Sequence, residues 1–202
     1  DSTVVLSAQE IGNAFYGLQG MNSEQAEVRT LLSALTAKVH ESREALGAQH
    51  IGNALYGLQR MDSNSPEVRA LLSALTAKVH DSTEALKAQH IGNALYGLQS
   101  MDSDSLEVRA LLSALTTKVQ RWREGRDAQA IGNAWYGLQG MSSEVPEVRA
   151  LLSALTTKVQ ESTEELAAQG VGNALYGLQN MSSEVPEVRA LLSALTTKVQ
   201  SC

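Results

Sequence analysis

The chain repeats itself every 40 residues, and this period constrains its fold more than any other feature. An isoleucine or valine opens the first block of every repeat, at Ile11, Ile51, Ile91, Ile131 and Val171. A second block follows in each repeat, and residues 141–160 are identical to residues 181–200. A length of 202 residues would otherwise suggest one or two globular domains. The period instead predicts five small units, with the boundaries 1–40, 41–80, 81–120, 121–160 and 161–202.

Both blocks have the apolar spacing of an amphipathic helix. In the second repeat, Ile51 and Leu58 begin and end an i, i+3, i+4, i+7 stripe, and the segment 68–79 continues the same spacing over about three turns. We therefore expect a first helix near 48–60 and a second helix near 66–80 in this repeat. The unit is predicted to be a helix–turn–helix.

The expected helix ends carry capping residues. Ser7 and Glu10 have the spacing of a capping box, and Ser65 stands before a proline as an N-cap. Gly20 and Gly140 suit a left-handed position just after a helix. These residues support the helical interpretation of both blocks.

A two-helix unit cannot bury its apolar face alone, whereas stacked units can. The fold class that we expect is all-α, a right-handed α-solenoid of five helix–turn–helix repeats within a single domain. Gly52 and Gly57 are glycine in every repeat, although glycine destabilises a helix interior by about 1 kcal/mol. Close helix–helix approach is the expected reason. The last repeat keeps its apolar pattern up to Val199, so we also expect an open apolar end and end-to-end self-association.

Composition excludes several classes of protein. Sixteen Lys and Arg against 22 Asp and Glu give a net charge of −6, which argues against binding to nucleic acid by bulk charge alone. The single cysteine, Cys202, excludes a disulfide scaffold and a cysteine-based zinc site. No apolar run has the length of a membrane span, so no membrane partner is expected. Because the chain starts at Asp1 without methionine, we expect a fragment or a processed form, and the compartment cannot be inferred from composition.

The sequence offers no support for catalysis. Its four histidines occur in the first three repeats only and form no metal-ligand spacing. It has no G-x-S-x-G motif, and its glycines lie inside predicted helices rather than in a phosphate-binding turn. We therefore expect a protein that is not an enzyme and that holds no cofactor and no metal.

The polar residues that recur on the first helix are the main candidates for binding. Gln49, Asn53 and Tyr56 fall on one side of this helix, as do their counterparts. The full candidate rows are Asn13, Asn53, Asn93, Asn133 and Asn173, and Tyr16, Tyr56, Tyr96, Tyr136 and Tyr176. Amides both donate and accept hydrogen bonds, so stacked rows suit a repeating polymer. The structural alternative is that the amides bond a neighbouring backbone while the tyrosines pack with their hydroxyls at the surface.

Basic residues recur on the second helix, represented by Arg69 and Lys78. Five such arginines in register would make a row of phosphate contacts. The alternative is local electrostatics, in which Arg69 pairs with nearby acids and Lys78 favours the negative end of the helix dipole.

Two columns vary between repeats and are candidates for selectivity. One reads Glu10, His50 and His90 in the first three repeats, directly before the conserved isoleucine. The other contains Arg60 and Ser100, but it coincides with the position after the helix where Gly and Asn are favoured for backbone reasons. A variable column beside fixed Asn and Tyr is typical of a modular reader that takes one ligand unit per repeat.

The fourth repeat departs most from the others. It is the only repeat with a net positive charge, and it contains Arg121, Trp122 and Arg123 in its entry loop and Trp135 in its first helix. Arginine beside tryptophan suits base stacking or phosphate binding. The alternative is that Trp122 covers a neighbour's apolar edge.

The pattern Ala48-Gln49-x-Ile51-x-Asn53-Ala54-Leu55-Tyr56-x-Leu58, followed by Pro66-Glu67 and Leu71-Leu72-x-Ala74-Leu75, resembles the octotricopeptide repeat. This family is related to the pentatricopeptide class of helical-hairpin repeats, and the resemblance spans essentially the whole chain. It implies a sequence-selective binder of single-stranded RNA in an organelle, with the RNA along the first-helix face. The sequence departs from the family at Tyr56-Gly57, where an aromatic residue followed by alanine is common, and it has single prolines where the second helix begins.

Three functions follow for a modular binding protein; the first is the one that we expect, and the other two are alternatives. The first is a single-stranded RNA-binding solenoid that reads about one nucleotide per repeat. The second is a scaffold that holds an extended peptide through the asparagine row. The third is an engineered repeat protein without a natural ligand, which the strict period favours and the irregular segment 121–123 opposes.

Overall fold

The computed structural model describes residues 5–122, 134–162 and 168–200. Every regular element in these ranges is a helix, so the expected all-α class is confirmed. The helices are α1 (Ala8–Tyr16), α2 (Ala26–Glu41), α3 (Ala48–Tyr56), α4 (Pro66–Asp81), α5 (Ala88–Leu98), α6 (Leu106–Arg121), α8 (Pro146–Glu161), α9 (Ala168–Gly177) and α10 (Pro186–Gln200). None of these described helices is long and apolar enough to cross a membrane.

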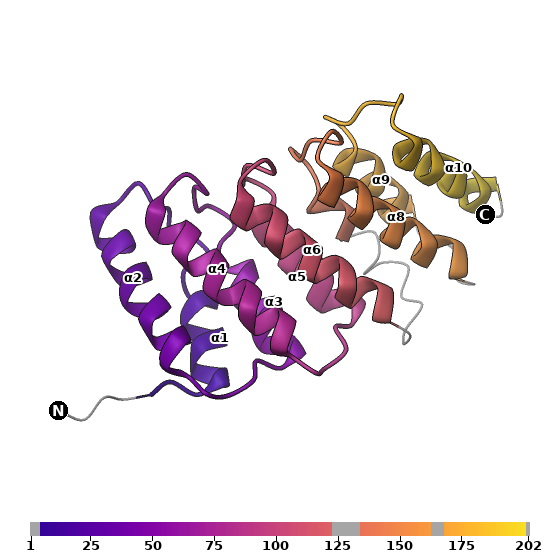
Figure 1. Ribbon diagram of the computed structural model, residues 1–202. Helices are drawn as coiled ribbons and strands as arrows, with labels where there is room; N and C mark the ends of the chain where they lie inside the picture. The colour runs from indigo at the N-terminus through magenta and orange to yellow at the C-terminus, as the bar shows by residue number, and fades with distance from the viewer. Residues whose placement is uncertain (1–4, 123–133, 163–167, 201–202) are drawn as a thin grey trace.

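The helices form two layers (Figure 1). Layer A contains the first helices α1, α3, α5 and α9, and layer B contains the second helices α2, α4, α6, α8 and α10. Within each layer a helix packs on the helix that lies one repeat further along the chain, α1 on α3 and α2 on α4. The core lies between the layers. It is built from aliphatic residues of both, including the fully buried Leu58, Leu72 and Val108.

Glycine sets the close packing within layer A. A Cβ atom built on Gly57 would lie 1.9 Å from the carbonyl oxygen of Phe15 in the preceding first helix. A Cβ atom on Gly52 would lie 3.2 Å from the Cα atom of His90 in the following one. Each helix of the layer therefore presents glycine to a neighbour, as the sequence predicted, because any larger side chain would hold the backbones apart.

Two of the expected helix caps are confirmed. Ser7 and Glu10 form the predicted capping box, in which the Glu10 N–H donates to Ser7 Oγ at 3.3 Å and the Ser7 N–H donates to Glu10 Oε2 at 2.8 Å. Gly140 has the predicted left-handed backbone, with φ at 82°. The expectation for Gly20 was wrong, because its φ is not positive.

Two further details differ from the prediction for the second repeat. The first helix ends at Tyr56 rather than near residue 60, because the chain continues through i+3 turns in which the Leu58 N–H donates to the Leu55 carbonyl at 2.9 Å. Ser65 occupies the N-cap of α4, but its side chain does not cap the helix. Its hydroxyl donates to Glu67 Oε2 at 2.7 Å instead.

Candidate binding face

Five tyrosines, one from each repeat, form a continuous stack along layer A. The ring centroids of successive members lie 5.6, 5.4, 5.8 and 5.1 Å apart, and the planes differ by 21° or less. We call this set the tyrosine stack: Tyr16, Tyr56, Tyr96, Tyr136 and Tyr176. Offset stacking of this kind stabilises each ring pair by about 0.5–1.5 kcal/mol beyond the buried area.

The stack follows from the glycine beside each tyrosine. Because Gly57 and Gly97 each face the backbone of the preceding first helix, successive helices approach closely enough for the rings of Tyr56 and Tyr96 to meet. Both of these rings are half-buried. Inside the stack the ring faces cover one another, so a ligand that approaches layer A meets ring edges and hydroxyl groups.

The asparagines of the same layer present free amides. Asn13 is exposed, while Asn53 and Asn93 are half-buried, and within the described residues their side-chain amides make no hydrogen bond. The structural alternative for these residues was a hydrogen bond from the amide to a neighbouring backbone. Asn13, Asn53 and Asn93 make no such bond to a described residue. Asn173 is half-buried and engaged in an interaction, and Asn133 lies outside the described residues.

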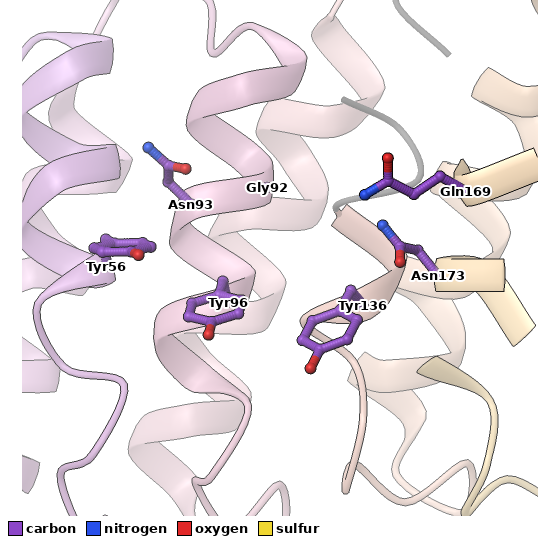
Figure 2. A pocket seen from close by; sticks show the side chains of 7 residues that line it. All are labelled: Tyr56, Gly92, Asn93, Tyr96, Tyr136, Gln169 and Asn173. Atoms are coloured by element: carbon purple, nitrogen blue, oxygen red, sulfur yellow. The ribbon is translucent and has the colours of Figure 1, made fainter. Parts of the chain in front are cut away.

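Amides and tyrosines together line a groove of about 400 Å³. Its lining residues are Tyr56, Gly92, Asn93, Tyr96, Tyr136, Gln169 and Asn173 (Figure 2). The figure shows the three rings in a row, with Asn93 above Tyr56 and Tyr96 and the amides of Gln169 and Asn173 above Tyr136. No formal charge lies among these lining residues. The groove therefore offers hydrogen-bond donors and acceptors with little electrostatic field of its own.

The first variable column lies at helix N-termini, where its residues act as caps. His50 Nδ1 accepts from the Gly47 N–H at 3.3 Å, and His90 Nδ1 accepts from the Lys87 N–H at 3.2 Å. Glu10 does the same for Ser7, and this bond to the Ser7 N–H lowers the pKa of the carboxyl group. These candidates for selectivity thus have a local structural role.

The pKa of His90 is shifted by the position of this residue between α3 and α5. Burial lowers the pKa of its imidazole, and the nearby ammonium group of Lys87 lowers it further, while Glu84 opposes the shift. The neutral ring is the form that accepts the Lys87 N–H through Nδ1. The capping bond and the lowered pKa are therefore consistent with each other.

The other candidates are spread over the molecule. Arg60 is exposed at the end of the turn that follows α3, and Arg121 is exposed as the last residue of α6. Trp122 is the C-cap of α6 and is only 4% exposed, as expected if it covers an apolar edge, and Trp135 is buried as well. Neither ring has a free face for a base, so both are left out of the proposed face. Arg123 lies outside the described residues.

Many of the recurring cations are engaged within the protein. The ammonium groups of Lys78, Lys118 and Lys198 donate to the carbonyl oxygens of Ser42, Ser82 and Ser162, which are the residues that follow the preceding layer-B helix. The Lys78 bond measures 2.5 Å. A cation at a helix C-terminus is stabilised by the helix dipole. The sequence predicted that these lysines favour the C-terminus of a helix. The three ammonium groups do bind a helix C-terminus, but it belongs to the preceding repeat.

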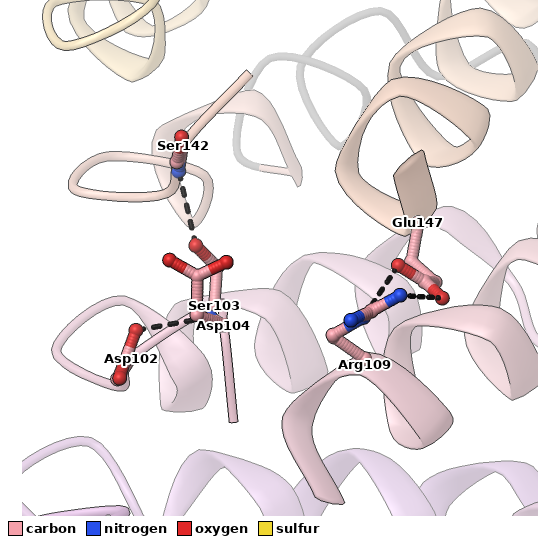
Figure 3. Close-up of polar contacts among 6 residues, drawn as sticks. All are labelled: Asp102, Ser103, Asp104, Arg109, Ser142 and Glu147. Atoms are coloured by element: carbon pink, nitrogen blue, oxygen red, sulfur yellow. Dashed lines mark hydrogen bonds and ion pairs between the residues drawn. The ribbon is translucent and has the colours of Figure 1, made fainter. Parts of the chain in front are cut away.

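Two arginines of layer B are also engaged. Arg109 binds Glu147 of the next layer-B helix in a bidentate pair, with Nε and Nη2 at 2.9 and 3.1 Å from the two carboxylate oxygens (Figure 3). Hydrogen bonds from Arg109 hold the pKa of Glu147 below its ordinary value. Arg29 donates to the carbonyl oxygens of Ser23 and Glu24. These side chains are not free for phosphate.

Sequence reasoning missed two sets of bonds between repeats. The first is a row of buried serine hydroxyls that accept backbone N–H groups of the following repeat. The pairs are Ser23 with Asp62 at 2.8 Å, Ser63 with Asp102 at 2.9 Å, Ser103 with Ser142 at 3.1 Å and Ser143 with Ser182 at 3.0 Å (Figure 3 shows the third). The sequence feature that could have indicated this row is the serine that stands two residues after the loop methionine in all five repeats.

The second set caps the first helices. Glu44 Oε2 accepts the Ala8 N–H at 2.8 Å, and Glu84 Oε2 accepts the Ala48 N–H at 2.7 Å. A carboxylate from one repeat thus occupies the N-terminus of the preceding first helix, where the helix dipole favours negative charge. The signal was a glutamate at this position in four of the five repeats. At these two helices the site that an external anion would use is already filled.

The comparisons with known proteins found no match for this chain among family models, curated proteins or solved structures. Within residues 5–122, 134–162 and 168–200, no group of three His, Cys, Asp or Glu side chains is placed to hold a metal ion.

Proposed function

We propose that the protein is a modular binding protein, a right-handed α-solenoid of five 40-residue repeats that holds an extended peptide along layer A. The observation that carries this proposal is the pair of free, half-buried amides at Asn53 and Asn93, which stand one repeat apart beside the tyrosine stack. An extended peptide backbone presents one donor and one acceptor per residue, and an amide side chain can satisfy both.

The charge of the face supports a peptide over a polyanion. The groove between Tyr56 and Asn173 is lined by uncharged residues, and several of the recurring cations bind the protein's own carbonyl or carboxylate groups. Nucleic-acid binding draws much of its free energy from cations that contact phosphates. A ligand with a neutral backbone requires no such contacts.

Single-stranded RNA is the second candidate, because the amide rows also suit the Watson–Crick edges of unpaired bases. In this case the specificity would lie in base edges rather than in phosphates. Affinity would then fall as salt rises, according to the number of phosphates that Arg60 and other exposed cations contact.

The test compares two double variants by peptide display and by RNA-pool capture at about 50 mM salt. Asn53→Ala with Asn93→Ala removes the free amides. Ser73→Ala with Ser113→Ala is the matched control, because both serines are exposed on layer B. We expect the unaltered chain and the control to capture extended peptides and the asparagine variant to lose capture, with the helical circular dichroism signal unchanged.

Two other outcomes would contradict the peptide proposal, and each leads to a different conclusion. Retention of RNA that depends on Asn53 and Asn93, without peptide capture, would replace the proposal by the RNA function. Equal capture by both double variants would remove the asparagine row from the site and contradict both functions on layer A.

A further inference from the structure

The polar groups along layer A recur from repeat to repeat, so on their own they give a ligand no unique position. Gln49, Asn53, Tyr56 and Gln59 have the same residue types at their counterparts in every repeat. A peptide that moves by one repeat therefore meets the same amides and rings again. Only a group that differs between repeats can make one of these positions more stable than the others.

The variable residues at the start of the first helices are already used inside the protein. His50, His90 and Glu10 each accept the backbone N–H of the N-cap residue of their own helix. This column therefore stabilises helix ends. The second variable column, which stands directly after the recurring glutamine, is the other source of a difference between repeats.

In this second column Arg60 differs from its counterparts in having a free side chain with a charge. Gly140 adopts a left-handed backbone with φ at 82°, and Ser100 Oγ donates to the Gln59 carbonyl at 2.8 Å, so these two counterparts have local roles. Arg60 is exposed, and its side chain makes no hydrogen bond or ion pair with any described residue. Its guanidinium group is therefore available to a ligand.

Arg60 is also unusual in charge for its place on layer A. The first helices and the turns that follow them are described over residues 8–20, 48–60, 88–100, 134–140 and 168–180. Within these ranges Arg60 is the only lysine or arginine. It stands four residues after Tyr56, whose ring lines the uncharged groove. The Arg60 cation thus distinguishes the second repeat from its neighbours on a face whose recurring groups are neutral.

We propose that Arg60 binds a carboxylate of the peptide ligand and so fixes which part of the peptide faces the second repeat. This role rests on the proposed function, in which the ligand is an extended peptide. The peptide then has an uncharged polar stretch for the amides of Asn53 and Asn93, and one acidic group for Arg60, from an Asp or Glu side chain or from a C-terminus. A guanidinium group holds a carboxylate through two parallel hydrogen bonds. Because the pair is exposed, it changes affinity only about 2- to 5-fold, and its main effect is on the position of the peptide.

Fluorescence anisotropy with three labelled peptides of asparagine and serine measures the preference for an acid. The first peptide has one internal Asp and an amidated C-terminus, the second has Asn in place of this Asp, and the third has no Asp but a free C-terminal carboxylate. We expect an acidic peptide to bind the unaltered chain about 2- to 5-fold more tightly than the neutral one, and comparison of the two acidic peptides identifies the source of the carboxylate.

Arg60→Gln should remove this advantage, and raised salt should reduce it. Lys87→Gln is the matched control and should retain it, because Lys87 is an exposed cation at the N-cap of α5 rather than in a turn after a first helix. Equal affinity of the unaltered chain for all three peptides would overturn the role of Arg60 while the peptide function stands. Binding of none of the three would contradict the peptide function itself.

A photo-crosslinking group beside the acidic residue of the peptide reports its position, which mass spectrometry of the cross-linked chain identifies. Arg60→Ser combined with Ser100→Arg transfers the cation to the third repeat at constant composition, and both side chains are exposed. We expect the cross-links to move one repeat toward the C-terminus in this variant and to spread over several repeats in Arg60→Gln. Cross-links that stay in place in both variants, or that spread in Lys87→Gln instead, would overturn the proposal.

Discussion

Gly97 lies so close to Leu55 that a Cβ atom on the glycine would be 1.8 Å from the leucine's carbonyl oxygen. The contact joins α5 to α3 and involves backbone on both sides, so no side-chain rotation can relieve it. The same relationship joins Gly57 to Phe15 and Gly177 to Trp135. The spacing of layer A, and with it the tyrosine stack, depends on this single missing methyl group.

Gly97→Ala is therefore expected to destabilise the protein by about 3 kcal/mol or more, since the two helices must separate along the whole contact. Gly172→Ala is the matched control, because this helical glycine has nothing within 4 Å of the added Cβ atom. The control should stabilise the protein by about 0.5–1 kcal/mol through helix propensity. Chemical denaturation measures both changes, and equal effects would contradict the role of the close approach.

The glycine contact is a part of the fold that the sequence predicts. Glycine at positions 52 and 57 of the second repeat, and at their counterparts, is unfavourable inside a helix, so a packing reason is expected from physical chemistry alone. The apolar spacing likewise predicts the helices. The residue at which the first helix ends is not predictable in this way. The helix would end near residue 60 if i+4 hydrogen bonds continued, and it ends at Tyr56 because i+3 bonds replace them.

Lys118 provides a second test, because its ammonium group is buried and donates to the Ser82 carbonyl at the end of the preceding layer-B helix. Lys118→Met keeps the length of the side chain but leaves this carbonyl without its charged partner. We expect a loss of about 1–3 kcal/mol in unfolding free energy. Lys38→Met is the control, since Lys38 pairs with Glu41 on the surface and should change stability by less than about 0.5 kcal/mol.

A loss as small as that of the control would show that the Ser82 carbonyl is satisfied without Lys118. Burial lowers the pKa of the Lys118 ammonium group, and Arg121 lowers it further. The folded protein thus holds the proton less tightly than the unfolded chain does. This term opposes folding at neutral pH, and the hydrogen bond to Ser82 offsets it.

Ser103→Ala tests the serine row. The mutation removes the hydroxyl that accepts the Ser142 N–H at 3.1 Å and leaves this N–H without that acceptor. We expect a loss of about 1–3 kcal/mol, measured as a lower midpoint of thermal unfolding. Ser113→Ala on the exposed face of α6 is the control and should be neutral or slightly stabilising. Equal midpoints for the two variants would mean that the row contributes nothing to packing between repeats.

The serine row and the tyrosine stack show why part of the candidate face escapes sequence reasoning. An invariant Ser103 is compatible with a turn, a cap or a contact between repeats, and only the register of neighbouring repeats decides among them. The sequence placed Asn93 and Tyr96 on one side of a helix. Whether the rings stack on one another or point at a ligand depends on the distance between neighbouring first helices, which no residue spacing within a repeat determines.

His90 predicts a pH dependence whose sign follows from its environment. Burial and Lys87 lower its pKa in the folded protein below the ordinary value of about 6.5 that applies to the unfolded chain. As pH falls through that ordinary value, the unfolded chain takes up a proton first, so the stability present above it is lost toward the lower folded pKa. Protonation also removes the lone pair of Nδ1 that accepts the Lys87 N–H.

His90→Gln should therefore reduce the loss of stability between about pH 7.5 and about pH 5.5, because glutamine can still accept the capping bond but does not titrate. Denaturant unfolding at the two pH values measures the difference. His80→Gln is the matched control, since it makes the same substitution at a side chain that is 83% exposed. If His90→Gln retains the same pH dependence as the unaltered chain, the titrating group is not at the seam between α3 and α5.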